Sequence, residues 1–235
     1  MASSTITVAT YNIHDAVGGD GKFSPERIAA VLAEIDADII ALQEVGANHD
    51  GVDTLERLRD ATGLHAVAGP ARWRAAGAHG NCLLSRHRIV ECTHLDLTYG
   101  RREARSALDA VVECDGTLLR VLATHLGLRP AERRAQVRSL LKALEAETPH
   151  PTLLMGDLNE WFLWGRPLRW LHAHFEATPS PRSFPARAPL LALDRIWVEP
   201  RALLQRLWVH ASPAARAASD HVPVVADIRL PDATL

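Results

Sequence analysis

Two polar side chains that could take part in chemistry follow a short apolar run in the second half of the chain. Leu153 to Met155 reads as the end of a buried strand, and Asp157 and Asn159 follow Gly156, which we expect to break that strand. Their spacing places both side chains on the same side of an extended chain. A carboxylate beside a carboxamide can orient a water molecule and coordinate a hard cation. The alternative is an ordinary turn, because Gly, Asp and Asn are common turn residues.

Polar residues also stand at the ends of other predicted strands. The first strand, Ile6 to Tyr11, is followed by Asn12, and the second, Asp38 to Leu42, is followed by Gln43 and Glu44. Strand ends that meet at one edge of a sheet bring such side chains together. Taken singly, most of these residues have an ordinary explanation, such as a surface ion pair or a turn. The full set of strand-end residues is Asn12, Glu44, His125, Asp157, Asn159, Asp194, Asp220 and His221.

The elements that must position these residues are mostly strands. Further strands are predicted at His65–Ala68, Asn81–Ser85, Ile89–Leu97, Ser106–Val112, Leu118–His125, Ala192–Val198, Leu203–Val209 and Val222–Ile228. Helices are predicted after Ser24-Pro25 and over Thr54–Ala61, Pro130–Glu145 and Pro167–His174, whereas Ala71–His79 and Thr178–Pro189 read as loops. Many neighbouring strands are joined by turns too short for a crossover. This favours a four-layer α/β sandwich of two packed mixed β-sheets flanked by helices over a doubly wound sheet.

Length and composition limit the classes of protein that the chain could belong to. With 235 residues and no linker, residues 1–235 are expected to form a single domain. The formal net charge of −2 gives no general attraction to nucleic acid or to an anionic membrane. Cys82, Cys92 and Cys114 match no zinc or disulfide spacing. The N-terminus lacks a signal-peptide pattern and no apolar run could span a bilayer, so we expect a soluble, cytoplasmic protein without a transmembrane segment.

Six short stretches that contain the strand-end residues follow one another in a recognisable order. They are Thr10–Ile13, Ile40–Glu44, Thr124–Leu126, Gly156–Asn159, Leu193–Ile196 and Ser219–His221. Together they resemble the endonuclease/exonuclease/phosphatase superfamily, whose best-known members are similar to DNase I and the abasic-site endonucleases. The resemblance spans nearly the whole chain and implies a DNase I-like fold and a metal-dependent phosphoester hydrolase.

The resemblance also implies a role for each strand-end residue. Glu44 would be the principal ligand of Mg²⁺ or Mn²⁺, with Asn12 and Asp220 completing the metal site, and an oxygen-only set suits a hard cation. Asn12 could instead donate a hydrogen bond to the phosphate. Asp157 would position or deprotonate the attacking water, and Asn159 would hold the phosphate or that water.

The two histidines and one arginine would act on the phosphate. His221, oriented by Asp194, would stabilise the negative charge that develops there, because a carboxylate partner favours the cationic imidazole. His125 would act in a similar way on the side of the leaving group. Arg105 is expected to bind phosphate, although two preceding arginines compete with it for that role.

The loop after Asn159 is the part of the sequence most informative about the substrate. Trp170 is expected to pack a helix against a sheet, whereas Trp161, Phe162 and Trp164, if exposed, could stack on unpaired bases or lie at a lipid interface. We predict a phosphodiesterase acting on a lipid headgroup or small phosphodiester, with transient contact to a membrane surface. The alternatives are a DNA or RNA nuclease and, from another class, a non-catalytic phosphate-binding module. The oligomeric state, the number of metal ions and the preference for diester or monoester stay open.

Overall fold

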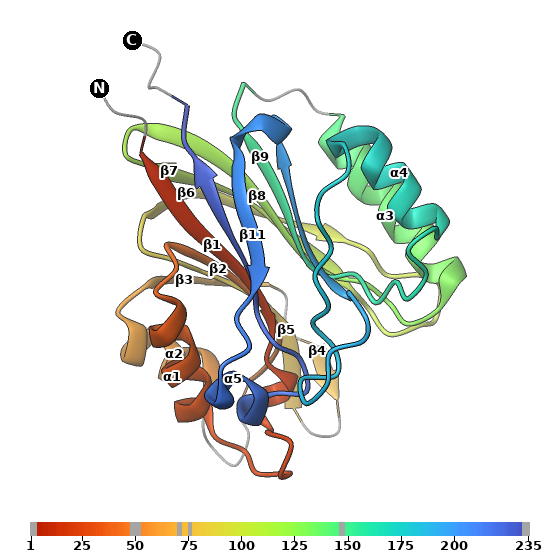
Figure 1. The fold of residues 1–235 in the computed structure, drawn as a ribbon. Coiled ribbons are helices and arrows are strands. Elements are labelled where there is room, and N and C mark those ends of the chain that lie inside the picture. Colours follow the sequence, from red (N-terminus) through yellow and green to blue (C-terminus); the bar gives the residue numbers. More distant parts are fainter. Residues whose placement is uncertain (1–3, 48–52, 70–71, 75–76, 146–148, 232–235) are drawn as a thin grey trace.

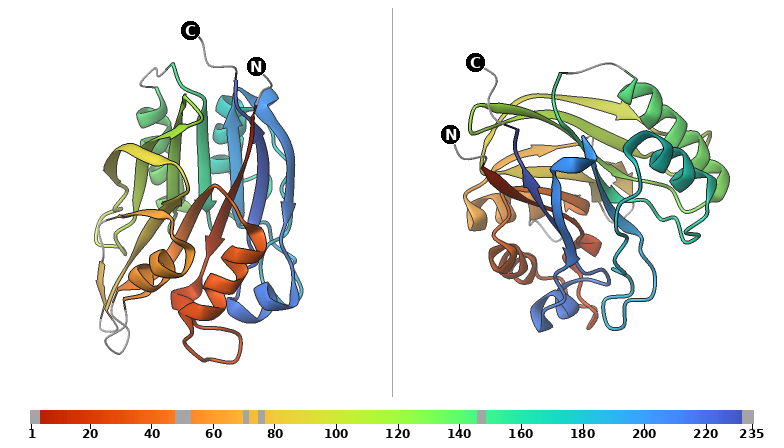
Figure 2. Two further views of the ribbon diagram at one scale, coloured as in Figure 1. Left: turned by 90° about the vertical axis from the view of Figure 1, so that its left-hand side faces the viewer. Right: turned by 45° about the horizontal axis from the view of Figure 1, so that its top comes forward.

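Two β-sheets packed face to face form the centre of the molecule, and helices cover the outer face of each (Figure 1). The computed structural model describes residues 4–47, 53–69, 72–74, 77–145 and 149–231. Figure 2 shows from two further directions that the helices of the two halves lie on opposite outer sides. The expected four-layer α/β sandwich of two packed mixed β-sheets flanked by helices is therefore confirmed.

The first sheet has seven strands and combines both ends of the chain. Its order is β11-β12-β1-β2-β5-β3, with β4 paired to β5. β1 and β2 are parallel, and the other pairs are antiparallel. The strands are β1 (Thr5–Asn12), β2 (Ile39–Ala47), β3 (His65–Ala68), β4 (Arg72–Arg74), β5 (Gly77–Ser85), β11 (Leu204–Val209) and β12 (Val224–Arg229). The outer helices here are α1 (Pro25–Ile35), α2 (Thr54–Thr62) and α5 (Pro213–Ala218).

The second sheet comes from the middle of the chain and has five strands in the order β10-β9-β8-β7-β6. β8 and β9 are parallel, with α3 as the crossover between them, and the other named pairs of this sheet are antiparallel. The strands are β6 (Arg88–Asp96), β7 (Ser106–Cys114), β8 (Thr117–His125), β9 (Thr152–Asp157) and β10 (Asp194–Glu199). The helices α3 (Pro130–Leu144) and α4 (Arg166–Phe175) pack on its outer face, and η1 (His14–Ala16) and η2 (Arg201–Leu203) are short 3-10 turns.

Aliphatic side chains fill the space between the sheets. Val8 and Ile39 of the first sheet and Leu108, Val121 and Ile196 of the second are all fully buried in this cluster. Each such side chain stabilises the fold by roughly 1.5–3 kcal/mol through burial. The packing fixes the two sheets relative to each other, and with them the strand ends that carry the polar residues. Among the described residues, no helix combines the length and apolar character needed to cross a bilayer.

Two sequence predictions need correction, and one helix was not predicted. Gly156 does not break β9, which continues to Asp157 with φ of 153° at Gly156. A Cβ there would lie 1.9 Å from the carbonyl oxygen of Thr124, so only glycine lets β8 and β9 approach this closely. The segment predicted as a loop over Ala71–His79 holds β4 and the start of β5, apart from residues 71 and 75–76, which lie outside the described residues. A three-residue strand is too short to show alternation. The helix α5 was not predicted, since its six residues are too few to show a helical apolar period.

Candidate active site

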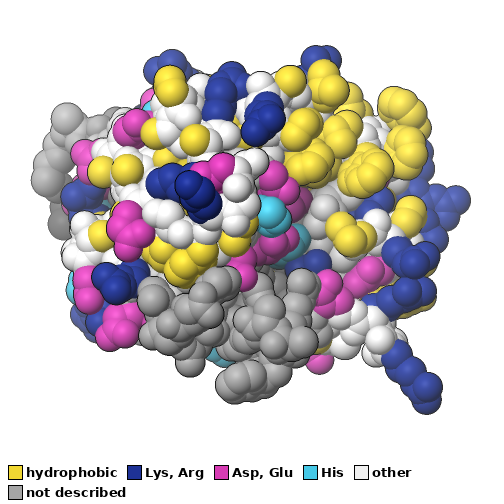
Figure 3. All heavy atoms as spheres, turned by 90° about the horizontal axis from the view of Figure 1, so that it is seen from below, with side chains coloured by type: hydrophobic (Ala, Val, Ile, Leu, Met, Phe, Trp, Pro, Cys, Tyr) yellow, Lys and Arg dark blue, Asp and Glu magenta, His cyan; other side chains and the backbone are white. Residues whose placement is uncertain are grey.

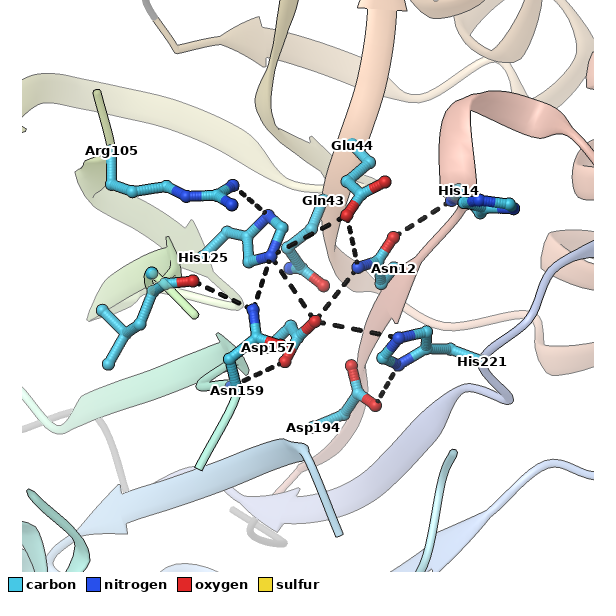
Figure 4. A network of polar contacts seen from close by, with 12 residues as sticks. Asn12, His14, Gln43, Glu44, Arg105, His125, Asp157, Asn159, Asp194 and His221 are labelled. Atoms are coloured by element: carbon cyan, nitrogen blue, oxygen red, sulfur yellow. Dashed lines mark hydrogen bonds and ion pairs between the residues drawn. The ribbon is translucent and has the colours of Figure 1, made fainter. Parts of the chain in front are cut away.

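Several strand ends meet at one edge of the sandwich, at the lower end in Figure 1, and carry the side chains drawn in Figure 4. β1, β8 and β9 end at Asn12, His125 and Asp157, while the antiparallel β10 begins at Asp194. The register pairs Asp157 with both His125 and Asp194. His221 comes just before β12, which pairs with β1. The sheet topology thus gathers residues that are up to 209 positions apart (221 minus 12).

The carboxylate of Asp157 lies at the centre of this group and is buried. Its Oδ2 accepts a hydrogen bond from Asn12 Nδ2 at 3.0 Å, and its Oδ1 accepts one from the backbone N–H of Asn159 at 2.8 Å. Burial, reinforced by the negative charge of Asp194, raises the pKa of Asp157 to about 6. The carboxyl group is therefore still ionised at neutral pH, and it is a stronger base than an exposed aspartate.

Glu44 is presented by a bulge in β2. The register with β5 shifts between Leu42 and Val45, and Glu44 has a φ of 54°. This left-handed conformation costs roughly 1–3 kcal/mol for a residue other than glycine. It places Glu44 Oε1 3.2 Å from Asn12 Nδ2, which donates a hydrogen bond to it. Asn159 shares the same backbone conformation, with φ of 50°, so two of the predicted site residues carry local strain.

His221 and Asp194 form a buried ion pair. His221 Nδ1 donates to Asp194 Oδ2 at 2.7 Å, and His221 Nε2 lies 3.8 Å from Asp157 Oδ2. Burial by itself would lower the pKa of His221, but the carboxylates of Asp194, Asp157 and Asp220 outweigh it and raise that pKa to about 10. The imidazole is therefore cationic at neutral pH. The ring of Phe184, with its centroid 4.8 Å from that of His221, packs against the pair.

His125 is held between an arginine and an amide. Arg105 Nη1 lies 2.9 Å from His125 Nδ1, and a guanidinium can only donate, so Nδ1 is the acceptor. Its Nε2 lies 3.5 Å from Asp157 Oδ2 and 3.0 Å from Asn159 Nδ2. His125 Nε2 thus faces the centre of the site, where His221 supplies a cation.

The three neighbouring arginines differ in how exposed their side chains are. Arg101 and Arg102 are exposed, whereas the Arg105 side chain is 11% exposed and also pairs with Glu103 at 3.3 Å. Of the three, it is Arg105 that joins the polar network of Figure 4.

Asp220 is joined to the group through its neighbour in the chain. Ser219 Oγ lies 2.8 Å from the carbonyl oxygen of Asn12 and 3.4 Å from Asp220 Oδ1. His14 lies on the other side, with Nδ1 4.0 Å from Asp220 Oδ1 and its backbone N–H donating to Asn12 Oδ1 at 3.0 Å. All eight strand-end residues are therefore at one edge, with Asp220 at its margin.

Comparison with known proteins identifies the family. The sequence model of the Endonuclease/Exonuclease/phosphatase family matches residues 9–221, a range that includes every residue of the group. The chain belongs to this family. Its members are mostly hydrolases of phosphoesters and generally depend on a divalent metal.

Several known proteins are similar over nearly the full chain. The uncharacterized protein YbhP of Escherichia coli (strain K12) is 31% identical in an alignment of 252 residue positions that covers 95% of this chain and 96% of YbhP. A family member from Beutenbergia cavernae DSM 12333 has a TM-score of 0.80 at 25% identity, covering 97% of this chain and 72% of that one. A mannosyl-6-phosphatase from Bacteroides thetaiotaomicron VPI-5482 has a TM-score of 0.73 at 20% identity, covering 94% and 98%.

The residues fit the divalent metal on which family members generally depend. The side chains of Glu44 and Asp220 are 34% and 40% exposed, so a hydrated cation could reach both carboxylates. Asn12 offers a neutral amide oxygen, which accepts from the backbone N–H of His14 and has a second lone pair, and such an oxygen-only set suits a hard divalent cation. A second grouping, Asp157, Asp194 and His221, has ligand atoms within 4.8 Å of one another. It suits a metal less well, because Asp194 and the cationic His221 already bind each other at 2.7 Å.

Sequence reasoning missed one buried ion pair beside the group. Arg133 of α3 and Glu160 are each 3% exposed, with Nε 3.1 Å from Oε2. Glu160 directly follows Asn159, and its position could have been noted. Its partner could not be identified, because a charged residue in an amphipathic helix normally faces solvent.

Proposed function

We propose that the protein is a divalent-metal-dependent phosphodiesterase that cleaves a lipid headgroup or another small phosphodiester by in-line attack of an activated water. One observation carries this proposal. The ionised carboxylate of Asp157 lies beside a cationic His221, with 3.8 Å between Oδ2 and Nε2. A base next to a buried cation can take a proton from water while the cation attracts the phosphate that the water attacks.

Asp157 is the residue that would hold and deprotonate the water. Its raised pKa makes it a better proton acceptor, and hydrogen bonds from Asn12 and from the Asn159 backbone fix its orientation. Deprotonation turns the water into the nucleophile, and the ester oxygen leaves from the opposite side of the phosphorus.

Hydrogen-bond donors on two sides would stabilise the negative charge that develops on the phosphate. His221 supplies a positive charge held in place by Asp194. His125 Nε2 and Asn159 Nδ2 lie 3.0 Å apart and would together bind a phosphoryl oxygen on the other side. When bound by Glu44 with Asn12 and Asp220, Mg²⁺ or Mn²⁺ would act as a Lewis acid on a phosphoryl oxygen.

Exposed aromatic rings beside the site favour a lipid headgroup. Trp161, Phe162 and Trp164 are 58%, 52% and 74% exposed, in the loop that starts two residues after Asn159. Such rings suit a lipid interface, and the net charge of −2 does not favour a duplex. A cytoplasmic location with transient contact to a membrane surface completes the proposal.

A nuclease acting on DNA or RNA is the second candidate, because the same rings could stack on unpaired bases. A non-catalytic phosphate-binding module is disfavoured. Such a module would have no need of a buried, ionised carboxylate beside a cationic imidazole, which costs stability without aiding phosphate binding.

Hydrolysis of artificial esters tests the proposal. Bis-p-nitrophenyl phosphate and p-nitrophenyl phosphate are compared with Mg²⁺, Mn²⁺ or EDTA, for the wild type and Glu44→Ala. We expect metal-dependent cleavage of the diester that EDTA and the substitution abolish. Preference for the monoester would mean that the protein is a phosphatase and not a phosphodiesterase. Phosphatase is the activity named for the Bacteroides neighbour. The absence of metal-dependent cleavage of either ester, together with no metal binding by calorimetry, would contradict the proposal.

Phospholipid vesicles and single-stranded DNA then separate the two candidate substrates. We expect release of headgroup from the vesicles and no cleavage of DNA. Cleavage of DNA without release of headgroup from phospholipid would establish the nuclease instead.

A further inference from the structure

A cluster of large apolar side chains is exposed beside the candidate active site. Trp161, Phe162, Leu163 and Trp164 are 58%, 52%, 58% and 74% exposed, and Leu128 is 64% exposed. Most of the exposed large hydrophobic side chains in the described part of the chain are in this cluster, which we call the apolar rim (Leu128 and Trp161–Trp164). Exposed apolar clusters of this kind mark interaction sites.

The apolar rim adjoins the site through the chain itself. Leu128 follows His125 at the end of β8, and Trp161 follows Asn159 after β9, so both parts continue from neighbouring parallel strands. Asn159 Nδ2 also donates to the carbonyl oxygen of Leu126 at 3.0 Å. Figure 3, seen from below, shows hydrophobic side chains gathered beside a group of acidic and histidine side chains on the same face, with basic side chains further out.

A buried ion pair fixes the two parts of the apolar rim to each other. Arg133 Nε and Nη2 lie 3.1 and 3.3 Å from the Glu160 carboxylate. Arg133 Nη1 also donates to the carbonyl oxygen of Leu128 at 2.6 Å, and Glu160 Oε1 accepts from the backbone N–H of Phe162 at 3.2 Å. These hydrogen bonds therefore hold in place the backbone that carries the exposed rings.

A turn in the loop further restricts the same backbone. The backbone N–H of Gly165 donates to the carbonyl oxygen of Phe162 at 2.8 Å, which closes a turn over the segment. A Cβ at Gly165 would lie 2.8 Å from Glu160 Cδ, so glycine permits the turn to lie against the ion pair. The ring centroids of Phe162 and Trp164 are 5.9 Å apart, so the rings pack on each other rather than on the core.

The charges next to the apolar rim identify its partner. Arg129, Arg166 and Arg169 are exposed, and residues 161–170 contain no acidic side chain. Indole and phenyl rings bordered by arginines match the boundary between headgroups and acyl chains in an anionic bilayer. We propose that the apolar rim docks on an anionic phospholipid bilayer, with the aromatic rings in the interface and the arginines on the headgroups. This deepens the proposed function, because the substrate phosphate would then be presented from the bilayer to the adjoining site.

Vesicle co-sedimentation of the full chain tests this inference. The test compares wild type, Trp161→Ser/Trp164→Ser and Arg166→Gln/Arg169→Gln on phosphatidylcholine vesicles with and without phosphatidylglycerol. The control is Val90→Ser, which changes an exposed residue (45%) of β6 near the end of the sheet away from the site. We expect the wild type and the control to bind the phosphatidylglycerol vesicles, and each double variant to bind at least about tenfold more weakly.

The outcomes also separate this inference from the proposed function. Hydrolysis of bis-p-nitrophenyl phosphate is measured on the same proteins, and we expect it to be unchanged in both double variants. Vesicle binding that depends on the tryptophans, without any diester hydrolysis, would support docking and contradict the proposed function. Wild-type protein that cleaves the diester but does not bind vesicles, or a tryptophan variant that binds as well as wild type, would overturn docking. Binding of single-stranded DNA in place of vesicles would overturn it as well.

Discussion

Arg105 Nη1 lies 2.9 Å from His125 Nδ1, and this contact fixes the orientation of the imidazole. A guanidinium has no acceptor, so Nδ1 accepts the hydrogen bond. The other ring nitrogen, Nε2, then faces Asp157 Oδ2 at 3.5 Å and Asn159 Nδ2 at 3.0 Å. Arg105 thus directs His125 Nε2 toward the centre of the site, while His221 is cationic.

Replacing Arg105 by methionine should lower kcat for a phosphodiester by about 10- to 100-fold, with a smaller change in KM, because His125 loses its fixed position. The ¹⁵N chemical shifts of the imidazole should change as well, because Nδ1 loses the hydrogen bond from the guanidinium. Arg102→Met is the matched control, since Arg102 is exposed, and it should leave both measurements unchanged. Unaltered ¹⁵N shifts in Arg105→Met would contradict this role.

Glu44→Gln should remove metal-dependent turnover while the fold is retained. The substitution keeps the size of the side chain but removes the charge that a divalent cation requires. We expect kcat to fall by about 10³-fold or more and the binding heat of Mn²⁺ in calorimetry to be lost. The thermal midpoint without metal should change little, since the Glu44 side chain is 34% exposed. Retained Mn²⁺ binding would mean that other residues are the main ligands.

Asp157→Ala should abolish hydrolysis without unfolding the protein. The pKa of Asp157 is raised in the folded state from 3.8 to about 6, so its contribution to stability is present below pH 3.8 and is lost as the pH rises through 6. At pH 8 the ionised carboxylate therefore does not stabilise the fold. We expect a loss in kcat of about 10³-fold or more together with a thermal midpoint at pH 8 close to that of the wild type. Near-normal turnover with Mg²⁺ would refute the assignment of Asp157 as the base.

The pH dependence of stability should reveal the pair of His221 and Asp194. The pKa of His221 rises from 6.5 to about 10 on folding, so the stabilisation is fully present below pH 6.5 and is lost as the pH rises through 10. Asp194→Asn removes the largest cause that raises this pKa. Urea unfolding at pH 6, 8 and 9.5 should therefore show a decline in wild-type stability with pH that is smaller in the variant. Parallel curves for both proteins would contradict a cationic His221.

Sequence patterns were sufficient for the fold and for the grouping of the site residues. Strand ends can be read from apolar runs, and the parallel strands β8 and β9 end together and bring His125 and Asp157 to one edge. The details depend on contacts that no local pattern encodes. The left-handed Glu44 requires the bulge against β5, and the ion pair of Arg133 with Glu160 joins elements 27 residues apart. Specific pairings of this kind arise only when the sheets have packed.

The ion pair of Arg133 and Glu160 should couple stability to the geometry beside Asn159. Removing one partner leaves a buried charge, so Arg133→Met and Glu160→Leu should each lower the free energy of unfolding by about 3–5 kcal/mol. The double variant leaves no unpaired charge and should lose clearly less than the sum of the two single changes, as a urea double-mutant cycle would measure. Additive losses would show that the two side chains do not interact. Since Arg133 also holds the carbonyl oxygen of Leu128, the double variant should bind vesicles more weakly than wild type even where its fold is stable.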